Sequence, residues 1–83
     1  MNLKKKPVDV TLTRERRKSQ QWGVRIDRPG RSEAYDMKQR YADDSNARRG
    51  ARRNLNAVKI DGVWYWPDGR GNAHPIKFTI KRK

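Results

Sequence analysis

The segment SNARRGARRNLNA, residues 45–57, constrains the fold most, because the two faces of a helix formed here have opposite chemistry. At 100° per residue the two arcs do not overlap. The first arc consists mainly of small residues: Ala47, Gly50, Ala51, Asn54 and Leu55. The second arc contains Arg48, Arg49, Arg52 and Arg53. A helix with so little apolar surface, and with an interior glycine that costs about 1 kcal/mol, must be stabilised by docking closely on a sheet.

The helix is predicted to begin at Asp43, Asp44 or Ser45. Each of these side chains can accept hydrogen bonds from the free amides of the first turn, and carboxylates suit the positive end of the helix dipole. Adjacent carboxylates can also serve as metal ligands or as an acid and base pair. Capping explains them without such chemistry, so we predict neither a metal site nor catalytic residues here.

Two stretches before the helix, residues 8–13 and 22–27, alternate apolar and polar residues as half-buried strands do. The residues predicted to face inward are Val8, Val10, Leu12, Trp22, Val24 and Ile26.

The sequence RPGR, residues 28–31, predicts a type II turn that leads into a hairpin. If the first and last residues of this turn face each other, Val24 falls opposite Tyr35 and Trp22 falls opposite Met37. The outer face of the hairpin then carries three cations, and the sequence offers few acids to match them. We expect solvent or a polyanion to neutralise these side chains, which are Arg25, Lys38 and Arg40.

The sequence VKIDGVWYW, residues 58–66, has Asp-Gly at its centre, which is the strongest short-range signal for a hairpin in this chain. Pairing Ile60 with Val63 places Val58 and Tyr65 on one face. The other face then holds Lys59, Trp64 and Trp66.

After this hairpin, residues 67–72 are predicted to form a loop, whose glycines lack the spacing of a phosphate-binding motif. His74 has no second histidine or cysteine near it, so we predict a loop residue and neither a metal ligand nor a member of a catalytic triad. Residues 76–80, IKFTI, alternate again and are predicted to form the last strand.

Together these elements predict an α+β fold in the order β-β-β-α-β-β: an antiparallel sheet of about five strands with one helix packed on one face. We expect a single domain over residues 8–80, a flexible basic tail over 1–7 and a basic C-terminal end over 81–83. A chain of this size buries only about 60% of the surface of its unfolded form, so the core is thin. We therefore expect no small-molecule substrate and no cofactor.

Residues 22–57 resemble the YegP-like family of small bacterial domains, which join an antiparallel hairpin to a helix after a Y-x-x-K/D-x-x-A segment. Tyr41 and Ala47 occupy the tyrosine and alanine places of that segment here. The resemblance implies the hairpin-and-helix fold and supplies no catalytic residues. The order of three strands and a helix is also similar to the DNA-binding domains of plant AP2 factors and phage integrase arms, which lay their sheet in the major groove.

The chain has 22 Lys and Arg against 9 Asp and Glu, and its net charge of +13 favours phosphate polymers, acidic proteins or anionic lipid as partners. The lack of cysteine excludes disulfides, thiolate nucleophiles and cysteine-based zinc sites. The sequence has no apolar run of membrane-spanning length and no secretory apolar region. The apolar arc of the helix is too small to anchor it on a membrane surface. We therefore expect a cytoplasmic protein, in the host cytoplasm if it is phage-encoded.

The candidate nucleic-acid contacts are Arg48, Arg49, Arg52, Arg53, Arg25, Lys38, Arg40, Lys59, Trp64 and Trp66. The helix arginines are predicted to bind phosphates, because guanidinium groups do so bidentately and each neutralised phosphate releases counterions. Such a face can also simply be solvated. Trp64 and Trp66 can stack on bases beside Lys59, but a domain short of apolar residues favours them as core.

The sequence therefore predicts a small, non-enzymatic protein that binds DNA or RNA mainly through the phosphate backbone. The alternative is a protein-interaction module, such as a phage or mobile-element inhibitor or adaptor, that docks onto an acidic host protein.

Overall fold

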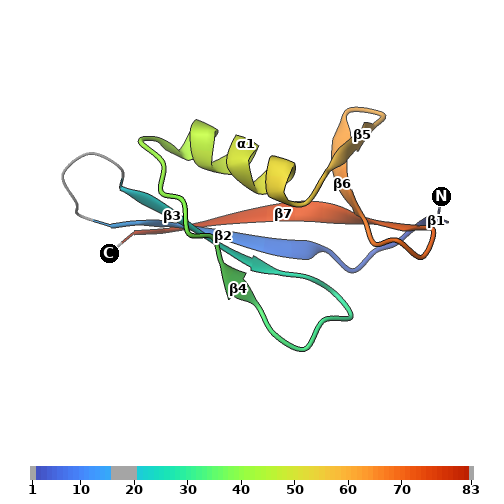
Figure 1. Ribbon diagram of the computed structural model, residues 1–83. Helices are drawn as coiled ribbons and strands as arrows, with labels where there is room; N and C mark the ends of the chain where they lie inside the picture. The colour runs from blue at the N-terminus through green and yellow to red at the C-terminus, as the bar shows by residue number, and fades with distance from the viewer. Residues whose placement is uncertain (1, 16–20, 83) are drawn as a thin grey trace.

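Seven strands and one helix make up the part of the chain that the computed structural model describes, residues 2–15 and 21–82 (Figure 1). The elements are β1 (Asn2–Leu3), β2 (Val8–Arg14), β3 (Trp22–Asp27), β4 (Tyr35–Asp36), α1 (Asp44–Asn54), β5 (Val58–Ile60), β6 (Val63–Pro67) and β7 (Asn72–Arg82). The predicted α+β class with one helix on a sheet is confirmed. No helix within these residues has the length and apolar character to cross a membrane.

The sheet is mixed and larger than predicted, with the strand order β4-β3-β2-β7-β6-β5 and with β1 paired to β7. Two antiparallel meanders, β2-β3-β4 and β5-β6-β7, are joined where β2 and β7 run parallel at the centre. The prediction of about five strands, all antiparallel, was therefore wrong in count and in direction. Alternation of apolar residues indicates which face a strand buries, but it says nothing about the direction of the neighbouring strand.

The pairing of β2 with β7 brings together two runs of alternating residues that are far apart in sequence. Val10 lies opposite Phe78, and Leu12 lies opposite Ile80. The apolar residues of both strands consequently share the face that the helix covers.

The segment predicted as a basic tail contributes a strand. Asn2 and Leu3 pair with Asn72 and Ala73 of β7 in parallel. At the other end of the chain β7 continues to Arg82, two residues beyond the expected domain boundary, and residues 1 and 83 lie outside the described part. Chain ends that were assigned no structure thus extend the sheet.

The first hairpin forms with a different register from the predicted one. The turn at residues 28–31 closes through a hydrogen bond of 3.2 Å between its ends, and Gly30 has the positive φ of 78° that a type II turn requires. Tyr35 lies opposite Ile26, however, and not opposite Val24. The shift is by two residues, so the predicted faces are kept although the partners change.

The second hairpin has the predicted register. Ile60 lies opposite Val63, and Val58 lies opposite Tyr65. Asp61 and Gly62 have φ values of 49° and 81°, the positive values that a type I′ turn needs at both central positions.

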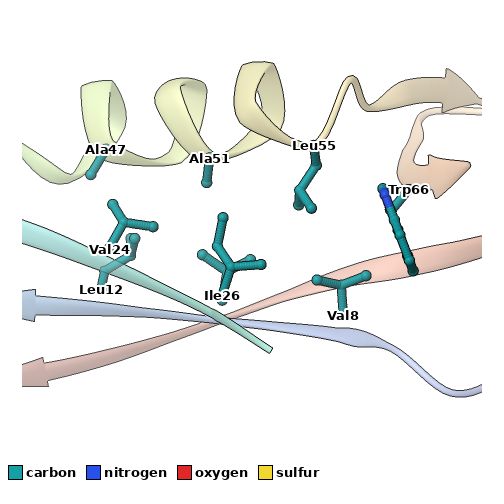
Figure 2. Close-up of a cluster of buried hydrophobic side chains, with 9 residues drawn as sticks. Val8, Leu12, Val24, Ile26, Ala47, Ala51, Leu55 and Trp66 are labelled. Carbon is teal, nitrogen blue, oxygen red and sulfur yellow. The ribbon is translucent and has the colours of Figure 1, made fainter. Parts of the chain in front are cut away.

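The core lies between the inner face of the sheet and the small-residue arc of α1. Figure 2 shows Ala47 and Ala51 pointing from the helix toward the side chains of β2 and β3, with Leu55 and Trp66 continuing the layer. The buried apolar residues are Val8, Val10, Leu12, Val24, Ile26, Ala47, Ala51, Leu55, Trp66 and Ala73. Burial of each larger side chain stabilises the fold by about 1.5–3 kcal/mol, and the alanines let the helix approach closely.

Gly50 is explained by one contact. Trp22 pairs with Tyr41, and not with Met37, through two backbone hydrogen bonds of 2.9 and 3.0 Å. This pairing lays the Tyr41 ring against α1, where a Cβ at Gly50 would collide with the ring carbons and the hydroxyl. The glycine therefore makes room for the tyrosine.

Gly50→Ala is expected to destabilise the domain by about 1–3 kcal/mol, because the added methyl group overpacks this contact. Helix propensity alone predicts the opposite sign, a gain of about 1 kcal/mol. Urea denaturation followed by circular dichroism measures the difference. In a Tyr41→Ala background the same substitution should become neutral or stabilising, and a Gly50→Ala variant more stable than the parent would contradict this account of the contact.

Candidate nucleic-acid interface

The helix is positioned so that its arginine arc faces away from the sheet. Asp43 caps the first turn by accepting a hydrogen bond of 2.8 Å from the backbone N–H of Asn46, which confirms the predicted start. Ala47 and Ala51 are buried on the sheet side. Arg49 and Arg53 consequently project toward solvent, whereas Arg48 and Arg52 are half-buried over aromatic rings of the sheet.

Arg48 interacts mainly with the domain itself. Its guanidinium lies 3.6 Å from the Asp44 carboxylate and 5.4 Å from the centre of the Phe78 ring. Its Nε is buried and has no hydrogen-bond partner among the residues described. Of the four helix arginines, Arg48 is thus the one that an internal carboxylate partly neutralises.

Arg49 and Arg53 are exposed and line a groove of about 590 Å³ beside the helix. The opposite wall is formed by the segment after β4, which includes Arg40 and Tyr41. Neither Arg49 nor Arg53 has an ion pair with any residue in the described ranges. The groove therefore presents two unpaired guanidinium groups one helical turn apart.

A second hollow of about 420 Å³ continues from this groove across the helix to Trp64, and Arg49, Arg52 and Arg53 line it. Arg52 lies over the half-buried Trp64 ring with its guanidinium carbon 5.0 Å from the ring centre. Lys59 lies 5.8 Å from the same ring. Three helix arginines, a tryptophan and a lysine from the second hairpin thus form one surface, which we call the arginine face: Arg49, Arg52, Arg53, Lys59 and Trp64.

Trp66 does not belong to this surface. Its exposed fraction is only 7%, and its ring packs against His74 with the ring centres 5.4 Å apart. The interpretation of Trp66 as a core residue is confirmed, and a base cannot stack on a ring buried in this way.

The sheet-side cations are better matched by acids than predicted. Arg25 pairs with Asp36 at 3.0 Å, and Arg40 pairs with Glu15 at 3.0 Å. The expectation that solvent or a polyanion must neutralise both was therefore wrong, because the hairpin register places Asp36 opposite Arg25 and because Glu15, directly after β2, lies beside Arg40. Lys38 is exposed and makes no ion pair with a described residue.

Arg25 and the arginine face lie on different sides of the sheet. Val24 and Ile26 point toward the helix, so Arg25 between them points away from it. Arg40 lies at the edge and lines both the groove of Arg49 and a smaller hollow of about 270 Å³ next to Arg25. The structure thus groups Arg40 with the helix arginines but does not group Arg25 with them.

His74 and Asp68 form a pair that the sequence reading missed. His74 lies within β7 and not in a loop, and its Nε2 is 3.0 Å from the Asp68 carboxylate. Asp68 also accepts hydrogen bonds from the backbone N–H groups of Arg70 and Asn72 at 2.7 and 3.2 Å. In an Asx turn, the side chain of an aspartate accepts a hydrogen bond from the backbone N–H two residues later. An aspartate at the start of a glycine-rich loop is typical of this turn, so the sequence of the loop could have indicated its conformation.

The bonds to Asp68 fix its charge state. The hydrogen bond from the Arg70 backbone, followed by the one from His74, holds the pKa of the Asp68 carboxyl well below its ordinary range. Within the described residues, no third acidic or histidine side chain lies close enough to Asp68 and His74 to complete a metal site.

Comparison of the chain with protein-family models, with curated proteins and with solved structures found no significant match. The resemblance to the YegP-like family therefore stays a prediction. The case for a function depends on the geometry of the chain itself.

Asp68→Asn is expected to lower the melting temperature at pH 7, and the gap to the parent protein should close as the pH falls. The fold binds the ionised carboxylate, so the pKa of Asp68 is lower in the folded than in the unfolded chain. Its stabilisation is therefore complete above the unfolded value of about 4 and declines progressively as the pH falls from there toward the much lower folded value. Thermal melts at pH 7, 5 and 3 test this, with Asp27→Asn as an exposed control. A gap that is equally large at pH 7 and pH 3 would refute the role of Asp68.

Proposed function

We propose that this domain binds nucleic acid through contacts of the arginine face with the phosphate backbone. The observation that carries the proposal is the set of guanidinium groups of Arg49, Arg52 and Arg53, which make no ion pair with residues 2–15 or 21–82 and line adjoining hollows on one side of the helix. These three positive charges repel one another, and this repulsion destabilises the fold. A bound polyanion would relieve it. Arg40 lines the same groove, but Glu15 pairs with it at 3.0 Å and Asp44 faces Arg48 at 3.6 Å, so both of these arginines contribute less.

Guanidinium groups are suited to this contact. They bind phosphate oxygens in pairs, and each neutralised phosphate releases condensed counterions into solution. Arg49 and Arg53 are four residues apart and hence on the same side of the helix. They can therefore contact phosphates along one strand.

Trp64 adds a second kind of contact at the border of the arginine face. Its ring is half-buried, with Arg52 and Lys59 over it. An unpaired base that replaces one of these cations on the ring would gain about 1–3 kcal/mol of stacking. Single-stranded nucleic acid can offer such a base, whereas a duplex keeps its bases stacked internally.

An acidic protein is the competing partner, because aspartate and glutamate side chains can also pair with the helix arginines. The two partners differ in an experiment with oligonucleotides alone. A nucleic-acid-binding domain associates with them at physiological salt, while a domain selected for an acidic protein shows only weak association that moderate salt removes.

Reversing two charges at the groove is expected to abolish binding. Arg49→Glu/Arg53→Glu should weaken the affinity for labelled single-stranded and duplex oligonucleotides about 100-fold or more, because both unpaired cations of the groove become acids. Fluorescence anisotropy measures the affinity, and circular dichroism checks that the helix persists.

The matched control is Lys77→Glu/Lys81→Glu, which makes the same change in net charge on exposed positions of β7. This control should keep most of the affinity, because these lysines alternate with residues that face the helix and so point to the other side of the sheet. Equal losses in both double variants would show that only total charge matters and would overturn the assignment to the arginine face.

The salt dependence gives a count of contacts. Plots of log affinity against log salt concentration should be linear, and Arg49→Gln/Arg53→Gln should reduce the steepness by roughly 2, since each phosphate contact contributes about 0.7–0.9. An unchanged slope in this variant would mean that these arginines do not contact phosphates.

A further inference from the structure

A second group of cations converges on a separate hollow of about 340 Å³ beside the loop between β6 and β7. The cations come from three segments that are far apart in sequence: Lys4, Lys5 and Lys6 before β2, Arg31 in the turn of the first hairpin, and Arg70 in the loop. We call this hollow the lysine pocket. It shares no lining residue with the two hollows of the arginine face.

A bulge in the sheet brings the three lysines to this place. Leu3 lies opposite Ala73 and Val8 lies opposite Ile76, so five steps of one chain run beside three steps of β7. The surplus residues loop out as the lysine segment. The Lys4 N–H donates to the carbonyl of Ala73 at 2.8 Å, which fixes one end of the bulge.

His74 fixes the other end of the bulge. Its Nδ1 lies 3.2 Å from the carbonyl oxygen of Lys6, while its Nε2 faces the carboxylate of Asp68. The imidazole ring thus lies between the lysine segment and the loop after β6. The floor of the pocket therefore joins the lysine segment to the loop that carries Arg70.

The turn that carries Arg31 is held by its neighbour Arg28. The Arg28 guanidinium lies 4.9 Å from the centre of the Tyr35 ring and 5.8 Å from that of Trp66, which also lines the pocket. Such contacts between a guanidinium and an aromatic ring are attractive and hold the side chain in place. Arg31 is thus presented from an anchored turn.

The charges around the pocket are strongly unbalanced. Its five Lys and Arg side chains are exposed and make no ion pair with a residue of the described ranges, and Asp68 is the only acid among the lining residues. Asp68 is itself occupied by donors from Arg70, Asn72 and His74. The pocket is therefore built to receive an anion from outside the domain.

We infer that the lysine pocket binds a phosphate group with two or more negative charges, from either the end of a nucleic-acid strand or a free polyphosphate such as pyrophosphate. A terminal phosphate carries up to two charges on three acceptor oxygens, so several ammonium groups can contact it together. An internal phosphodiester carries only one negative charge, so it gains less from several cations that point at the same place. Binding of a strand end rests on the proposed function, whereas binding of a free polyphosphate does not.

The first experiment uses the one histidine of the chain as a reporter. The imidazole signals of His74 are followed by NMR while pyrophosphate is added to the full-length protein at constant ionic strength. We expect a saturable shift, and an affinity at least about tenfold weaker in Lys5→Gln/Arg70→Gln. The variant Arg49→Gln/Arg53→Gln should bind pyrophosphate like the parent.

A shift that does not saturate, or that sodium chloride alone reproduces, would overturn the inference. Melting temperatures of both variants check that they are folded. If Lys5→Gln/Arg70→Gln does not fold, Arg31→Gln replaces it, because that side chain lies on an exposed turn.

The second experiment identifies the source of the phosphate. Affinities are compared for a single-stranded oligonucleotide with a 5′-phosphate, one with a 3′-phosphate and one with hydroxyl groups at both ends. If the ligand is a strand end, one phosphorylated form binds about tenfold more tightly than the hydroxyl form. Lys5→Gln/Arg70→Gln should abolish this preference.

The outcomes separate the two proposals. Binding of pyrophosphate without an end preference assigns the pocket to free polyphosphates. Binding of pyrophosphate with no oligonucleotide binding refutes the proposed function and leaves the lysine pocket in place. Oligonucleotide binding with neither an end preference nor a pyrophosphate shift overturns the lysine pocket alone.

Discussion

The close packing of α1 on β2 and β3 is the contact on which the remaining features depend. Ala47 and Ala51 are fully buried against the sheet, so the helix can rotate very little about its axis without losing this contact. That constraint directs Arg49, Arg52 and Arg53 outward. Because the chain has few other apolar residues to spare, the one helix of the described residues must both complete the core and present charge.

The parallel pairing of β2 with β7 has an equally wide effect. It places the start of the chain beside the loop between β6 and β7, and Figure 1 shows the N-terminus near that loop. The lysine segment, the first turn and Arg70 consequently meet at one pocket. Cations from three segments are concentrated there by sheet topology and not by a sequence motif.

Local sequence predicted the elements whose chemistry is local. The Asp61-Gly62 turn, the register around it and the cap at Asp43 were all predicted, because a type I′ turn and a helix start depend on a few neighbouring residues. The first hairpin was harder. Its turn was predicted correctly, but pairing resumes only at Tyr35, and the residues between turn and strand gave no signal for that delay. The partners of Arg25 and Arg40 depended on this register and on the position of Glu15 at the end of β2, so they could not be predicted.

The sequence by itself determined that one helix has a small-residue side and an arginine side, because its small residues and its arginines each recur at the helical spacing of 3.6 residues. It also determined the two hairpin turns. Only the tertiary structure decided that Arg48 is partly neutralised, that Trp66 is buried while Trp64 is only half-buried, and that His74 joins Asp68 to the lysine segment. These outcomes depend on contacts between residues distant in the chain, and such contacts are chosen by the global packing of the sheet, which no local pattern encodes.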